Sequence, residues 1–139
     1  MLAAELLMTV ALVGSVAIHL ILGSRHFLPF WSLGEYAHAH YHLMQHVAGV
    51  CGLCAVALIL VWVPLRRREH WSWWALLVAG GFLYGSNWLN QAFLGLTEPP
   101  LIPNSTQGIL GGVYSLGLFL GWGAVWRRTR HERTCHPTS

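Results

Sequence analysis

Lysine is absent from this 139-residue sequence, and charged residues of all kinds make up only 9% of it. Hydrophobic residues account for 55%, and the mean hydropathy is +0.49. A small soluble domain carries more charge and less apolar surface than this. The net charge of +3 comes from a few arginines, which is too little basic surface for nucleic-acid binding. We therefore expect a membrane protein whose partners include the lipid bilayer but no nucleic acid.

Cysteine is also scarce, with three residues in the chain. Cys51 and Cys54 form a CxxC pair, but this pair lies near the middle of a long apolar segment. A zinc or redox CxxC motif needs a turn and access to solvent. We therefore interpret Cys51 and Cys54 as packing residues on one face of a helix, while Cys135 is alone near the C-terminus.

In place of charge, the sequence has four long apolar segments, roughly Leu2–Leu22, Leu43–Leu65, Trp73–Leu96 and Gly108–Trp126. Each contains about 20 residues, the length with which a helix crosses about 30 Å of hydrocarbon. None alternates as a lipid-facing strand does. We predict an all-α protein, an integral membrane four-helix bundle over residues 1–126 with antiparallel neighbours. A polar, frayed cytoplasmic tail follows over residues 127–139, and a soluble helical bundle with an apolar core is the alternative.

The distribution of arginine predicts the orientation of these helices. One cluster follows the second segment, another follows the fourth, and only Arg25 lies on the opposite side. The positive-inside rule places both clusters and both termini in the cytoplasm, here of a bacterial inner membrane. Six tryptophans gather near the same side, as in an interfacial belt. The clusters are Arg66, Arg67 and Arg68, and Arg127, Arg128, Arg130 and Arg133; the tryptophans are Trp62, Trp71, Trp73, Trp74, Trp122 and Trp126.

Polar side chains recur in the outer half of all four segments. Such groups are costly at bilayer depth and usually mark a functional site. We therefore expect the four helices to surround one polar cavity near the outer leaflet, although amides and histidines there can also form interhelical hydrogen bonds or interfacial anchors. The residues are His19, His38, His42, His46, Tyr84, Asn87, Asn90, Gln91, Asn104, Ser105, Thr106, Gln107 and Tyr114.

The stretch HAHYHLMQH, residues 38 to 46, contains four of the histidines. On a helix His38, His42 and His46 follow one stripe, whereas His40 is about 200° away from His42. A single metal ion therefore does not bind all four. The stripe, with Glu35 one turn earlier, suits copper or zinc, whereas haem needs only one imidazole and an apolar slot. The residues themselves leave these two cofactors open.

Three short motifs resemble the membrane-bound styrene oxide isomerases and, more loosely, the hydroxylaminobenzene mutases. The first is Ala39-His40 in AHAHYHLMQHVAG, the second is Gly85-Ser86-Asn87 in YGSNWLNQAF, and the third is Ile102-Pro103-Asn104 before the fourth segment. Chain length and loop placement are also similar, so the resemblance covers roughly residues 5 to 125.

This resemblance implies a haem b cofactor with a single histidine ligand, at the position of His40, in a homotrimer with haem at the protomer contacts. It implies that ferric iron acts as a Lewis acid on an epoxide oxygen, and that a hydride shift within a small lipophilic substrate then gives an aldehyde. In this interpretation His46 and Asn87 touch or position the substrate. Gln91 or Tyr84 adds a hydrogen bond.

The sequence departs from the family at three positions that bear on catalysis. His46 stands where the family has asparagine, Gln91 lies near its catalytic tyrosine, and Leu83 lies near its acidic residue. The resemblance therefore supports haem ligation by this chain better than it supports epoxide isomerisation. Three alternatives stay open: a haem electron-transfer or sensor protein with a second ligand at His19 or His46, a structural subunit, and a copper or zinc subunit that uses His26, His38 and His42.

Overall fold

The computed structural model describes residues 1–27, 37–86 and 104–135, and within these ranges the chain is helical, without a strand. Helix α1 spans Leu2–Phe27. Helix α2, Ala37–Leu60, continues as the π-helical turn η2, Val61–Leu65. Helix α3, His70–Gly80, continues as a second π-helical turn, η3, Gly81–Gly85, and α5 spans Asn104–Cys135. The predicted all-α class is confirmed for these residues.

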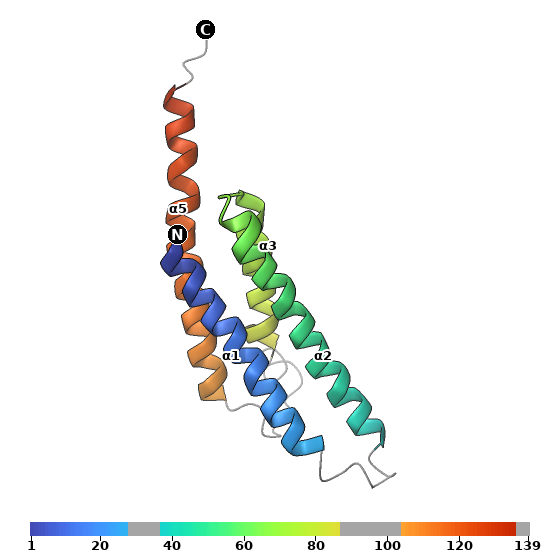
Figure 1. The fold of residues 1–139 in the computed structure, drawn as a ribbon. Helices are drawn as coiled ribbons and strands as arrows, with labels where there is room; N and C mark the ends of the chain where they lie inside the picture. The colour runs from blue at the N-terminus through green and yellow to red at the C-terminus, as the bar shows by residue number, and fades with distance from the viewer. Residues whose placement is uncertain (28–36, 87–103, 136–139) are drawn as a thin grey trace.

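Consecutive helices alternate in direction, and the start of α1 and the end of α5 lie toward the same end of the molecule (Figure 1). Helix α1 packs against both α2 and α5, while α3 packs against α5 and α2. The shared core contains Met8 and Leu12 of α1, Cys54 of α2 and Tyr114 of α5, all almost completely buried. Cys54 therefore packs in the core, as its apolar surroundings in the sequence predict.

Within the described ranges, three helices are long and apolar enough to cross a membrane: Leu2–Ile21, Tyr41–Leu65 and Ser105–Trp126, with mean hydropathies of 2.0, 2.4 and 1.5. Large apolar side chains cover their outer faces, with exposed fractions of 62% for Val10, 61% for Ile59 and 73% for Phe119. Exposing such apolar surfaces to water is unfavourable, whereas contact with lipid tails is not. For the predicted third span, Trp73–Leu96, the part from Asn87 onward lies outside the described residues.

Helix α1 approaches α5 closely at a glycine. A Cβ atom at Gly117 would lie 2.7 Å from Cγ of Met8 and 3.0 Å from the carbonyl oxygen of Ala4. These distances are shorter than van der Waals contact, so only glycine allows the two backbones to come this near. Small residues serve the same purpose at many helix contacts in membranes.

The end of the molecule that holds Met1 and the Arg66–Arg68 turn is rich in tryptophan contacts. The indole Nε1 of Trp62 donates to Oγ1 of Thr9 at 3.0 Å, and that of Trp73 donates to the Leu118 carbonyl at 2.9 Å. These bonds satisfy the polar atom of each indole while its ring packs among apolar groups. Two tryptophans of the predicted interfacial belt, Trp62 and Trp73, thus form hydrogen bonds between helices.

The turn between α2 and α3 explains how the chain reverses within a few residues. Arg68 has φ = 61°, and its amide donates to the Leu65 carbonyl at 2.8 Å. The Glu69 amide donates to the Pro64 carbonyl at 3.0 Å. These two bonds around a left-handed residue form a Schellman motif, a common end of a helix.

Two helices are longer than their apolar segments predict. Helix α2 begins at Ala37, before the predicted Leu43, so all four clustered histidines are helical. Helix α5 continues beyond Trp126 to Cys135. The expectation of a frayed tail from Arg127 is therefore wrong as far as Cys135. The residues there include arginine and glutamate, both of which have a high intrinsic helix propensity.

Candidate functional site

The buried histidine His19 on α1 is at the centre of the polar groups within the bundle. Its side chain is 6% exposed, and Nδ1 lies 2.7 Å from the carbonyl oxygen of Ser15, one turn earlier. A carbonyl oxygen only accepts, so Nδ1 carries the proton and donates it. The neutral ring then has its lone pair on Nε2. Histidines that bind metals are commonly oriented by such a bond from their other nitrogen.

His46 on α2 faces this residue. The ring centroids of His19 and His46 are 5.7 Å apart, and their planes are inclined by 46°. His46 is exposed, unlike His19, so the pair has one ring inside the bundle and one at its surface. The two imidazoles join α1 and α2 at the end of the molecule that is opposite the tryptophans.

A second polar contact joins α1 to the turn η3. The hydroxyl of Ser15 lies 2.9 Å from the Ala11 carbonyl and 3.0 Å from the hydroxyl of Tyr84. The serine has one proton, and the Ala11 carbonyl can only accept it. Tyr84 must therefore donate to Ser15 Oγ. His46, His19, Ser15 and Tyr84 form a polar chain across three helices, and we call it the His–Ser–Tyr chain.

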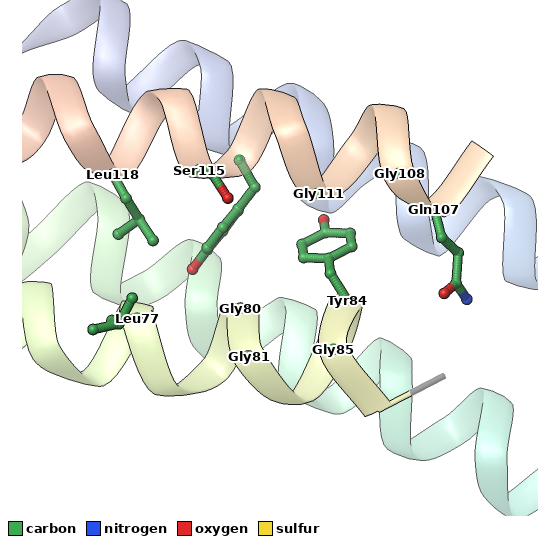
Figure 2. A pocket seen from close by; sticks show the side chains of 11 residues that line it. Leu77, Gly80, Gly81, Tyr84, Gly85, Gln107, Gly108, Gly111, Ser115 and Leu118 are labelled. Atoms are coloured by element: carbon green, nitrogen blue, oxygen red, sulfur yellow. The ribbon is translucent and has the colours of Figure 1, made fainter. Parts of the chain in front are cut away.

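Tyr84 also lines a groove between α3 and α5 of about 380 Å³ (Figure 2). Its ring lies beside Tyr114, with the two centroids 5.4 Å apart, and Tyr114 donates to the Leu76 carbonyl at 2.8 Å. Figure 2 shows Gln107 at one end of the groove and Leu118 at the other. Most of the wall between them is glycine backbone and aromatic ring.

Two of these glycines determine where the tyrosine rings lie. A Cβ atom at Gly80 would overlap the ring of Tyr114. At Gly111 it would lie 3.2 Å from Cβ of Tyr84. The absence of side chains at these two positions therefore allows Tyr114 and Tyr84 to approach the opposite helix closely.

The predicted site residues are only partly brought together among the described residues. His46 and Tyr84 both belong to the His–Ser–Tyr chain. Asn87 and Gln91 lie outside the described residues. His40 is within α2, and only its backbone position is described.

The helical register of α2 indicates on which face of the helix position 40 lies. Residues seven apart on a helix differ by only about 20° in direction. Position 40 is thus in line with Val47, Cys54 and Val61, all of which are buried. The register places it on the side of α2 that packs within the bundle, whereas the resemblance implies a ligand at a contact between protomers.

A metal site built from three or more ligands is not found among the described side chains. No group of three histidine, cysteine, aspartate or glutamate residues comes together there. The predicted copper or zinc stripe includes His38, whose side chain lies outside that description. What the described part does provide is the pair of His19 and His46.

Sequence reasoning missed Ser15, the residue that connects the two halves of the polar chain. A signal was present, because Ser15 precedes His19 by four residues and so lies on the same face of α1. His19 itself was among the expected polar residues. That its ring meets His46 was not predictable, since His46 belongs to another helix.

The chain matches no protein-family model, no curated protein and no solved structure. The resemblance to the styrene oxide isomerases therefore rests on the three short sequence motifs.

Proposed function

We propose that this protein is a membrane-embedded, haem b-dependent isomerase that rearranges a small lipophilic substrate. The observation that carries the proposal is the His–Ser–Tyr chain. His46 and Tyr84, expected at the site from sequence, are linked through the buried residues His19 and Ser15 of α1. Burying polar side chains in a membrane protein costs free energy, and such side chains usually mark a functional site.

The proposal includes a placement in the membrane. All four helices cross the bilayer of a bacterial inner membrane, with the arginine turn and both termini in the cytoplasm. The common end of the two termini in Figure 1 and the apolar outer faces of α1, α2 and α5 support this placement. The His–Ser–Tyr chain then lies in the outer half of the membrane, and residues 127–139 form the cytoplasmic tail.

His40 is the residue that would hold the haem, as the resemblance implies. One neutral imidazole is the only protein ligand that such a haem would need, and position 40 on α2 would supply it. When bound, ferric haem supplies a Lewis acid that polarises a substrate oxygen. The homotrimer that the resemblance implies is part of the proposal, although position 40 is in line with the packed face of α2.

The side chains of the polar chain perform the remaining tasks. His46 is exposed at the end of the chain and can take up or release a proton at the substrate. His19 packs against its ring, and the bond from Nδ1 to the Ser15 carbonyl keeps His19 in one tautomer and one orientation. Ser15 holds the hydroxyl proton of Tyr84, so the tyrosine oxygen presents its lone pairs to a donor. The apolar helices exclude water, which strengthens these electrostatic interactions.

The first experiment is the absorption spectrum of the full chain purified in detergent after expression with a haem precursor. We expect a Soret band, a b-type pyridine haemochrome, and loss of both in His40→Ala but not in His42→Ala. Aryl epoxides and N-aryl hydroxylamines are then supplied, and isomeric products are measured. A colourless preparation, or a His40→Ala variant that keeps its haem, contradicts the proposal.

A second candidate function is binding of zinc or copper by the His19–His46 pair. It is favoured by the fixed tautomer of His19, whose Nε2 carries the lone pair that a metal needs. Elemental analysis separates the two functions. Stoichiometric zinc or copper that is lost in His19→Leu, without any haem in the wild-type protein, supports the metal site and not the isomerase.

A further inference from the structure

The groove between α3 and α5 extends beyond the hollow of about 380 Å³ that Tyr84 lines. A second hollow of about 340 Å³ adjoins it and is lined by the aromatic residues Trp73, Phe119 and Trp122. The two hollows share Leu77, Ser115 and Leu118. Volumes of this size are typical of sites for small molecules. The groove thus has an aromatic end near the tryptophans and a polar end at Gln107.

Bare backbone forms much of the outer part of the wall. A Cβ atom added at Gly81, Gly85 or Gly108 would meet nothing within 4 Å. These glycines are therefore not required for packing within the described chain, unlike Gly80 and Gly111. The open space above them leaves room for a flat group against the ring of Tyr84, where aromatic pairs are favourable.

Gln107 supplies an unusual polar group at the outer end. Its Oε1 atom is buried and has no hydrogen-bond partner among the described residues, and the residue lines the groove. A buried acceptor without a donor is destabilising, because it has lost its hydrogen bonds to water and gained none in return. A ligand with an O–H or N–H group in the groove would remove this cost. A ligand without a donor would not.

We propose that the groove between α3 and α5 binds a small, neutral aromatic molecule with one hydrogen-bond donor, such as a benzylic alcohol. The ring packs against Tyr84 above the bare glycines, and the donor bonds to Oε1 of Gln107. This site goes beyond the proposed isomerase function and does not depend on it. The groove shares Tyr84 with the His–Ser–Tyr chain, but its other lining residues belong to α3, η3 and α5, whereas the His19–His46 pair lies between α1 and α2.

Photolabelling of the full chain in detergent tests the site without haem or turnover. The probe is a trifluoromethyl-diazirinyl benzyl alcohol, and the control probe has a methyl group in place of its hydroxymethyl group. We expect the alcohol to label groove residues of α3 and α5 saturably, with protection by excess benzyl alcohol. The control probe labels them roughly fivefold less, the ratio expected for one hydrogen bond.

Three variants make the assignment specific. Gly108→Leu fills the groove and abolishes the saturable labelling. Gly112→Leu is the matched control on the same helix, since a Cβ atom there also meets nothing within 4 Å and Gly112 does not line the groove. Gln107→Leu makes the two probes label equally. Melting temperatures and elution volumes of all three variants identify any that fails to fold.

The proposal is overturned by labelling that follows only the exposed apolar faces of α1 and α2. It is also overturned by saturable labelling that Gly108→Leu leaves unchanged. Equal labelling of the wild-type chain by the alcohol and its methyl analogue would show that Gln107 does not bind the hydroxyl group. This result would contradict the proposed ligand class.

Discussion

Ser15 on α1 accepts a hydrogen bond from the hydroxyl of Tyr84 on η3, and the two oxygens are 3.0 Å apart. The direction of this bond follows from the second contact of Ser15, whose own proton goes to the Ala11 carbonyl at 2.9 Å. The same tyrosine forms part of the groove wall beside Tyr114. One side chain therefore connects the His–Ser–Tyr chain to the groove.

Removing the serine hydroxyl should destabilise the protein more than removing the tyrosine hydroxyl. Ser15→Ala leaves the partly buried hydroxyl donor of Tyr84 without its acceptor, at a cost of about 1–3 kcal/mol. Tyr84→Phe leaves Ser15 bonded to Ala11 and costs less. The two variants and the double variant form a cycle, measured by unfolding in mixed micelles. A cycle without any coupling between the two changes would show that this bond does not form.

His46→Ala should lower isomerase turnover by roughly 10²–10⁴-fold while the haem content stays the same, because a positioned acid or base contributes about that much. Steady-state kinetics and the Soret absorbance measure the two quantities on one sample. His42→Ala, one turn away on α2, is the control. Equal losses of turnover in both variants would count against a specific role for His46.

Gly117→Val should destabilise the contact between α1 and α5. The added Cβ atom would lie 2.7 Å from Cγ of Met8 and 3.0 Å from the Ala4 carbonyl, so the helices must separate. Overpacking of this kind typically costs about 1–3 kcal/mol. Gly112→Val is the control, since a Cβ atom there meets nothing within 4 Å. Thermal denaturation in detergent should show a lower melting temperature for Gly117→Val alone.

The proposed orientation predicts which ends of α5 are open to the periplasm. In a background with Cys51→Ser and Cys54→Ser, the native Cys135 should react with a membrane-impermeant maleimide only after spheroplasts are permeabilised. In the same background with Cys135→Ser, Ser105→Cys should react in intact spheroplasts, since Ser105 is exposed at the other end of α5. The reverse pattern would place the termini outside the cytoplasm.

Several features of the fold follow from sequence because they depend on local chemistry. Runs of apolar residues near the length of a bilayer predict helices, and three such spans are present in the structure. The apolar setting of the CxxC pair correctly predicts a buried Cys54. The expectation of a frayed tail is wrong as far as Cys135, because arginine and glutamate favour continuation of the helix.

The site depends on contacts that no local pattern contains. Helical periodicity places His46 and His40 on different faces of α2, but only the burial of Val47, Cys54 and Val61 shows which face is packed.

The sequence by itself determined the helical class, the apolar spans and the polar residues on each helix, because these follow from composition and from the period of one helix. Only the tertiary structure decided that His19 meets His46 and that Ser15 meets Tyr84, 69 residues further along the chain. The reason is that the rotation and the axial shift of each helix are set by packing against its neighbours, at contacts such as that between Gly117 and Met8.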